Sequence, residues 1–277
     1  SIKANAANGS LTLDAINILN DGDNDITVFG NTWVDFANLD DFIAGTSSYT
    51  YRFTAQDGKL IIDDKITAGG LNAVVKRNEK TRSYSVGKYH NVFEDLGTLE
   101  GQDAKLTILG NDRVLNGEGF DGLTTQNGQT VVLKDIKSVE GFNSTDGGFI
   151  KNSGTLEVNN TSFKNNTATD NGGAIWSDND VNVTAAQGTD FEFTGNAAGG
   201  ESNAVYMAAS DAALSFRATG NSSITLNDKI NGVEGYKVNF VSDQDSSIKL
   251  NNLVENAGDV MVASNLYSAA DQYLNNS

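Results

Sequence analysis

A short phrase recurs along the second half of the chain and constrains its fold more than any other feature. Residues 147–150 (GGFI) return about 25 residues later as 172–175 (GGAI), and more weakly as 202–205 (SNAV) about 30 residues further on. Residues 163–166 (FKNN) return as 193–196 (FTGN). Self-similarity at a spacing of roughly 24–30 residues is the signature of a repeat architecture, in which each repeat stacks on its neighbours.

Short alternating apolar and polar runs fill the intervals between these phrases. Residues 105–109 (KLTIL), 155–158 (TLEV) and 247–250 (SIKL) are examples, and Gly, Asn, Asp and Ser turns separate them. Period-2 alternation predicts strands with one face inward, and regular short strands predict an all-β protein. Three such strands per repeat make one coil of a parallel β-helix (β-solenoid), with neighbouring coils about 4.8 Å apart. We expect apolar columns and asparagine ladders inside it.

The phrase resembles the repeat of the polymorphic outer-membrane protein family and related autotransporter passengers. The resemblance covers roughly residues 145–262. The residues that carry it are Phe163, Asn166, Gly172, Gly173, Ala174, Ile175, Phe193 and Asn196. It implies a right-handed parallel β-helix, an exported protein at the bacterial cell surface or outside the cell, and often adhesion or self-association.

The chain divides into four predicted parts. Residues 1–75 form N-terminal strands with irregular first coils or a cap, and residues 96–264 form the β-helix coils. Residues 76–95 form a basic loop that leaves the rod. Residues 265–277 form a C-terminal cap, a short amphipathic helix or a docking arm.

Composition excludes several classes of partner. The formal net charge is −17, which repels nucleic acid and anionic membranes. There is no cysteine, so there is neither a disulfide framework nor a thiolate metal site. There is also no proline, as expected of a chain that is mostly interior strand. No apolar stretch is long enough for a transmembrane helix.

A basic cluster interrupts this acidic chain and is the predicted docking site. It consists of Lys76, Arg77, Lys80, Arg82 and Lys88, with Tyr84 and Tyr89 interleaved. Its partner would be an acidic surface: a polyanionic glycan or protein on a host or neighbouring cell, or the acidic end of a second copy. The alternative is a solvated loop with no partner.

An acidic stretch contains the predicted metal ligands. Asp21, Asp23 and Asp25 alternate with Gly22 and Asn24, as carboxylates do in calcium loops. An Asp/Asn/Gly turn needs no metal, so a plain turn and a Ca²⁺ site both stay open. No other cofactor is expected.

Enzymatic activity is not expected. Polysaccharide hydrolases of this fold share Asn-Thr-Asp, Asp-Asp, Gly-His-Gly and Arg-Ile-Lys segments. Asp40-Asp41 and Asp63-Asp64 are present here, but the single histidine, His90, lies in Tyr-His-Asn, and Arg-Ile-Lys is missing. Fold alone does not imply such an activity.

The two tryptophans raise one further question. Trp33, Trp176 and the tyrosines would suit a sugar-binding ledge. Trp176 directly follows the Gly-Gly-Ala-Ile phrase, and a core or turn-packing role fits it equally well.

Three functions therefore compete. The first is a non-enzymatic, extracellular adhesive rod that resembles an adhesin passenger and associates with itself or with another cell. The second is a subunit of a head-to-tail extracellular filament. The third is a polysaccharide lyase or hydrolase of the β-helix fold.

Overall fold

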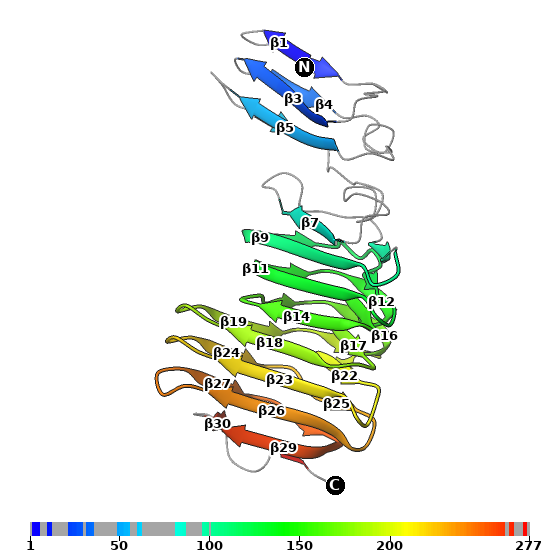
Figure 1. The fold of residues 1–277 in the computed structure, drawn as a ribbon, viewed down its shortest axis with the longest axis vertical. Helices are drawn as coiled ribbons and strands as arrows, with labels where there is room; N and C mark the ends of the chain where they lie inside the picture. The colour runs from blue at the N-terminus through cyan, green and yellow to red at the C-terminus, as the bar shows by residue number, and fades with distance from the viewer. Residues whose placement is uncertain are drawn as a thin grey trace.

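The protein is a parallel β-solenoid of about seven turns. The structure, a computed structural model, describes Val86, Leu96–Leu99 and residues 101–263, together with further strands outside these ranges. The coils stack from the N-terminal to the C-terminal end along the longest axis of the molecule (Figure 1). Every regular element within the described residues is a β-strand. This part of the chain contains no helix long and apolar enough to cross a membrane.

One wall of the solenoid is an eight-stranded sheet to which successive coils contribute one strand each. In chain order its strands are β8 (Gly97–Thr98), β10 (Leu123–Thr124), β13 (Ile150–Asn152), β17 (Ile175–Ser177), β22 (Val205–Met207), β25 (Ile230–Gly232), β28 (Val254–Glu255) and β31 (Leu274–Asn275). All its neighbouring strands are parallel. Each strand therefore enters the wall at the same edge.

A thirteen-stranded sheet forms the other long walls. Its strands are β7 (Thr81–Ser85), β9 (Lys105–Asn116), β11 (Thr130–Glu140), β14 (Thr155–Asn159), β15 (Phe163–Lys164), β18 (Val181–Ala185), β19 (Asp190–Thr194), β23 (Ala213–Ala218), β24 (Ser223–Leu226), β26 (Tyr236–Ser242), β27 (Ser247–Leu250), β29 (Ala257–Ala263) and β30 (Leu266–Ser268). The long strand β11 pairs with β14 through its first half and with β15 through its second half. The coils that follow β11 therefore use two separate strands where β11 uses one.

Three smaller sheets complete the described strands. One contains β12 (Asn143–Asp146), β16 (Thr167–Asn171), β20 (Ala197–Ala198) and β21 (Glu201–Ser202). The other two are N-terminal and contain β1 (Ile2–Asn5), β3 (Gly22–Phe29) and β5 (Tyr49–Ala55), and β2 (Ser10–Thr12), β4 (Thr32–Asp35) and β6 (Leu60–Ile62). Among the described strand pairs, β20–β21 alone is antiparallel.

The echoes in the sequence are partners across neighbouring coils, which confirms the solenoid prediction. Ile150 pairs with Ile175, and Ile175 pairs with Val205. Phe163 likewise pairs with Phe193. The step from Ile175 to Val205 is longer than the preceding step because that coil has a longer turn between β18 and β19: Val158 and Phe163 are five residues apart, whereas their partners Val183 and Phe193 are ten apart.

Alternating side chains fill the interior with an aromatic column. Phe163 lies 4.9 Å from Phe193 between ring centroids, and the two rings are stacked. Phe193 meets Phe216 edge-on at 6.0 Å, and Phe216 stacks on Phe240 at 5.6 Å. These rings are fully buried. Burying such rings supplies much of the stabilisation in a core without disulfides.

The structure corrects two local expectations. Asp23 and Asp25 lie within strand β3, so this part of the acidic stretch is not a turn. The expected C-terminal helix is also wrong where the structure describes that segment: Leu266–Ser268 is strand β30 and Leu274–Asn275 is strand β31. The reason in both cases is pairing, since β3 lies beside β5 and β30 extends the wall from β27.

The predicted basic loop also contains a strand. Thr81–Ser85 forms β7, which pairs in parallel with β9 and so belongs to the wall of the solenoid. The predicted boundaries at residues 75, 95 and 264 stay predictions.

Candidate functional site

A ladder of buried carboxamides runs through the coils at the repeat asparagines. The Asn166 side chain donates from Nδ2 to the Val139 carbonyl at 2.9 Å and to Asn196 Oδ1 at 3.0 Å. Asn196 donates from its own Nδ2 to the Phe163 carbonyl at 2.9 Å and to Asp228 Oδ2 at 2.8 Å. A buried polar group is costly unless it is hydrogen-bonded, and these partners lie in neighbouring coils. The ladder therefore fixes how one coil sits on the next.

Asp228 ends the ladder in the coil that follows Asn196. Its two carboxylate oxygens accept hydrogen bonds from the backbone N–H groups of Gly195 and Asn196, each at 2.9 Å. A carboxylate has no donor to pass to a further coil. The sequence phrase does not include this aspartate.

The paired glycines of the repeat are required by close backbone contact. A Cβ on Gly172 would lie 2.2 Å from the Ile175 carbonyl oxygen, and Gly172 has a φ of +63°. A Cβ on Gly173 would lie 2.4 Å from the Ala197 backbone nitrogen. The motif residues Phe163, Asn166, Ala174 and Ile175 are themselves buried. The repeat motif is therefore part of the scaffold.

The outer face of the eight-stranded sheet carries a continuous row of side chains, here called the outward row. Its positions are matched by strand register and alternate with buried ones. The outward row consists of Thr98, Thr124, Lys151, Trp176, Tyr206, Asn231 and Glu255. Trp176 and Tyr206 are partly exposed direct neighbours in this row.

Lys151 contacts Trp176 within this row. Its Nζ atom lies 4.9 Å from the centroid of the indole and forms an ion pair with Asp146 at 3.0 Å. A cation over an indole face is attracted by the ring quadrupole. The two contacts restrain both side chains at the surface.

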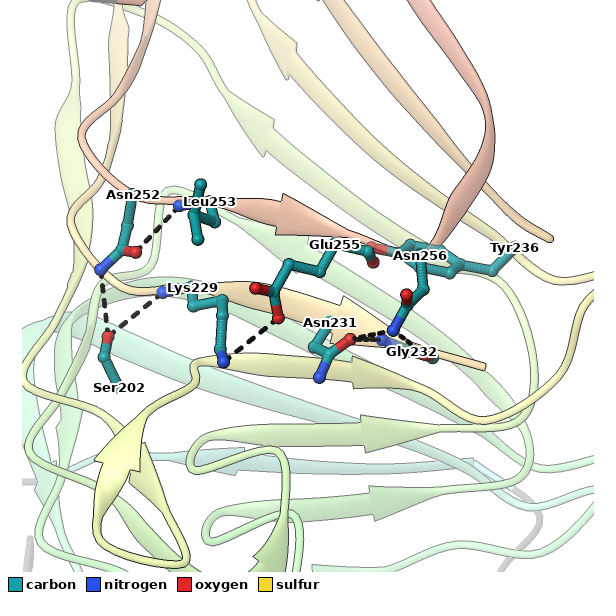
Figure 2. Close-up of polar contacts among 9 residues, drawn as sticks. All are labelled: Ser202, Lys229, Asn231, Gly232, Tyr236, Asn252, Leu253, Glu255 and Asn256. Atoms are coloured by element: carbon teal, nitrogen blue, oxygen red, sulfur yellow. Dashed lines mark hydrogen bonds and ion pairs between the residues drawn. The ribbon is translucent and has the colours of Figure 1, made fainter. Parts of the chain in front are cut away.

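The C-terminal end of the row is a compact polar network (Figure 2). Lys229 and Glu255 form an ion pair at 3.2 Å on neighbouring coils. Asn256 donates from Nδ2 to Asn231 Oδ1 at 2.9 Å and to the Gly232 carbonyl at 3.2 Å. The side chains of Lys229, Glu255 and Asn256 therefore bond to other groups of the same protein.

Two further residues tie this network to the interior and to the hairpin. The buried Tyr236 hydroxyl donates to the Glu255 carbonyl at 3.0 Å. Burial, and secondly the charge of Glu255, raise the pKa of Tyr236 far above its usual value. Ser202 Oγ in β21 accepts from the Lys229 backbone N–H at 3.2 Å and from Asn252 Nδ2 at 3.3 Å.

The residues predicted as a docking site are only partly described. Arg82 and Tyr84 lie in β7, where they pair with Leu106 and Ile108 of β9. Lys76, Arg77, Lys80, Lys88 and Tyr89 lie outside the described residues. The docking role of this cluster stays a prediction.

The predicted calcium ligands are also only partly described by the structure. Asp23 pairs with Thr50 and Asp25 with Arg52 in the N-terminal sheet, and Asp21 lies outside the described residues. The described part of the chain holds no group of three or more His, Cys, Asp or Glu side chains arranged to bind a metal. The Ca²⁺ site stays a prediction.

The sequence contains a signal for the outward row. Lys151, Trp176 and Tyr206 each follow the last residue of one echo of the phrase. Because alternate residues of a strand face opposite sides, the residue after a buried isoleucine or valine points outward. The sequence alone allows a ledge or a core role for Trp176, and the structure places it in the outward row.

Comparison with known proteins supports the repeat assignment. Residues 160–178 match the family described as the Chlamydia polymorphic membrane protein repeat. This confirms the resemblance over a shorter segment than residues 145–262, and the segment contains Phe163, Asn166 and Gly172–Ile175. No curated protein and no solved structure matches the chain.

Proposed function

We propose that this chain is a surface-exposed, adhesive β-solenoid that resembles an autotransporter passenger and acts without catalysis. The observation that carries the proposal is the match of residues 160–178 to a repeat of a membrane protein family, together with the role of those residues. The matched phenylalanine, asparagine and glycines pack inside the coils. The scaffold would therefore present its outer faces to a partner.

Two experiments test location and adhesion separately. Protease treatment of intact cells of the source organism, followed by immunoblotting, should degrade the protein before any cytoplasmic marker; full protection would contradict a surface location. The purified, fluorescently labelled chain should bind cultured host cells or neighbouring bacteria saturably. An excess of unlabelled chain should displace it, and binding that never saturates would contradict adhesion.

A filament subunit is the second candidate, and the C-terminal end of the described solenoid favours it. β29 lies at the end of the strand order of its sheet. Met261 is 50% exposed and Val262 is 45% exposed, although Val262 pairs with the fully buried Phe240. An uncovered edge strand with core-type side chains is a template for another strand.

Electron microscopy would separate the two candidates. If the edge of β29 joins copies end to end, negative staining should show unbranched fibres, and Val262→Lys should reduce them to single rods. Asp259→Lys is the control on the same strand, and it should leave the fibres intact. Single rods from the unsubstituted protein at high concentration would contradict the filament.

A further inference from the structure

We infer that Trp176 and Tyr206 form a binding ledge for an extended, uncharged polysaccharide strand. This inference rests on the proposed function and specifies the ligand of one face. The two residues, here called the aromatic ledge, are register partners on β17 and β22, whose backbones lie about 4.8 Å apart. Both are partly exposed on the outer face of the eight-stranded sheet.

The aromatic ledge keeps unused hydrogen-bond donors. Within the described part of the chain, no hydrogen bond uses the indole N–H of Trp176 or the hydroxyl of Tyr206. The polar neighbours in the outward row differ, since Lys151 is paired with Asp146 and Asn231 accepts from Asn256. Aromatic side chains with an apolar ring and a free polar tip are enriched where proteins bind partners. Sugar rings offer the complement, an apolar C–H face bordered by hydroxyl groups.

The backbone beneath the ledge is rigid. Trp176 lies between Ile175 and Ser177, which are both fully buried. Ser177 Oγ accepts a hydrogen bond from Asn152 Nδ2 of the preceding coil at 2.9 Å. The Lys151 ammonium restrains the indole from above the ring. A surface that is ordered before binding loses less conformational entropy on binding.

Charge selects the class of ligand. The charged members of the outward row are Lys151 and Glu255, whose charges cancel, and each has its own partner of opposite sign, Asp146 and Lys229. The whole chain carries −17 and this row adds no net positive charge, which disfavours a polyanionic glycan at this face. A neutral strand meets no such barrier. The row suits a chain of several sugar units, since each coil step is close to the length of one pyranose ring.

Tryptophan fluorescence tests the ledge directly because the chain has two tryptophans, Trp33 and Trp176. In a Trp33→Phe background, Trp176 is the sole reporter. Titration with cellohexaose, chitohexaose and mannohexaose should give a saturable change in emission for at least one of them. Heparin should give none.

Variants locate the binding site. Tyr206→Ala and Trp176→Ala should each weaken the affinity for the bound hexasaccharide about tenfold or more. The affinity of Tyr206→Ala is measured by fluorescence. That of Trp176→Ala is measured by calorimetry, because this variant lacks the fluorescent reporter. Phe120→Ala is the matched control, because Phe120 is 37% exposed and is not a member of the outward row. It should bind normally. Circular dichroism should show that all three variants keep their β-structure.

Each outcome decides the inference. No saturable change with any neutral hexasaccharide, or unchanged affinity in Trp176→Ala and Tyr206→Ala, would overturn it. Heparin binding that both variants lose would overturn the choice of an uncharged ligand. If the protein binds cells but not the hexasaccharides, the sugar-binding inference is wrong while the proposed adhesive function stands. If it binds a hexasaccharide but not cells, the sugar-binding inference stands while the proposed adhesive function is wrong.

Discussion

The side-chain amide of Asn166 donates a 3.0 Å hydrogen bond to the carboxamide oxygen of Asn196 in the next coil. Asn196 in turn donates to Asp228, one coil further on. All three side chains are buried. Two repeat asparagines and one aspartate therefore link three coils, and the consequences of breaking the link are measurable.

Replacing Asn196 with leucine should destabilise the protein strongly. The change leaves Asp228 without its side-chain donor and removes one of the hydrogen bonds to the Phe163 carbonyl, and an unsatisfied buried group costs about 1–3 kcal/mol. We expect a clear fall in the urea midpoint, followed by circular dichroism. Asn182→Leu, on an exposed position of β18, is the control and should change stability by about 0.5 kcal/mol or less. Equal effects of the two changes would contradict the ladder.

Gly172→Ala should destabilise more than Gly188→Ala. Both glycines have positive φ, +63° and +73°, so both changes carry the backbone cost of about 1–2 kcal/mol. A Cβ at Gly172 also meets the Ile175 carbonyl, whereas a Cβ at Gly188 meets nothing within 4 Å. Thermal unfolding of the two variants measures the difference. Similar melting temperatures of the two variants would show that the positive φ alone accounts for the requirement for glycine at residue 172.

Phe193→Ala should open a cavity in the aromatic column. Phe193 lies between Phe163 at 4.9 Å and Phe216 at 6.0 Å, and it is fully buried. Truncating a buried phenylalanine costs about 3–5 kcal/mol. Denaturant unfolding should show this loss, and Phe120→Ala, at an exposed ring, should leave the unfolding curve nearly unchanged.

The buried Tyr236 should make stability depend on pH in the alkaline range. Its pKa is raised by burial and then by the charge of Glu255, whereas an unfolded tyrosine titrates near pH 10. The folded state therefore keeps the proton longer than the unfolded state. The associated stability is complete below about pH 10 and is lost as the pH rises towards the pKa of the folded state.

Urea unfolding at pH 8 and pH 11 would measure this contribution. The unsubstituted protein should lose more stability between the two values than Tyr236→Phe. The variant should also be less stable at pH 8, by about 0.5–1.5 kcal/mol, because the hydrogen bond to the Glu255 carbonyl is missing. Identical pH dependence of the two proteins would argue against this role for Tyr236.

The predicted calcium site gives an expectation for the N-terminal sheet. If Asp21, Asp23 and Asp25 bind Ca²⁺, EDTA should lower the melting temperature and added Ca²⁺ should restore it, by mass action. An Asp23→Asn, Asp25→Asn double variant should lose this response. A melting temperature that does not change on addition of EDTA would contradict the predicted Ca²⁺ site.

Local patterns in the sequence predict much of the scaffold. Alternation in runs such as residues 247–250 predicts strands with a buried face, and the recurrence of Phe163 at Phe193 predicts coil-to-coil pairing. Such features depend on neighbouring residues and on repeat spacing, so they are readable along the chain. The C-terminal helix was predicted wrongly because its apolar spacing was read in isolation, whereas pairing with β27 makes Leu266–Ser268 a strand.

The sequence by itself determined an all-β solenoid with ladders of equivalent asparagines, because both follow from periodicity. Only the tertiary structure decided that Trp176 lies beside Tyr206, that Asp228 continues the asparagine ladder, and that Lys229 pairs with Glu255. These neighbours are separated by a whole coil, and coils differ in length: the longer turn between β18 and β19 lengthens one of them. The residues that meet on the outer face are set by turn lengths summed over a coil, which no local pattern contains.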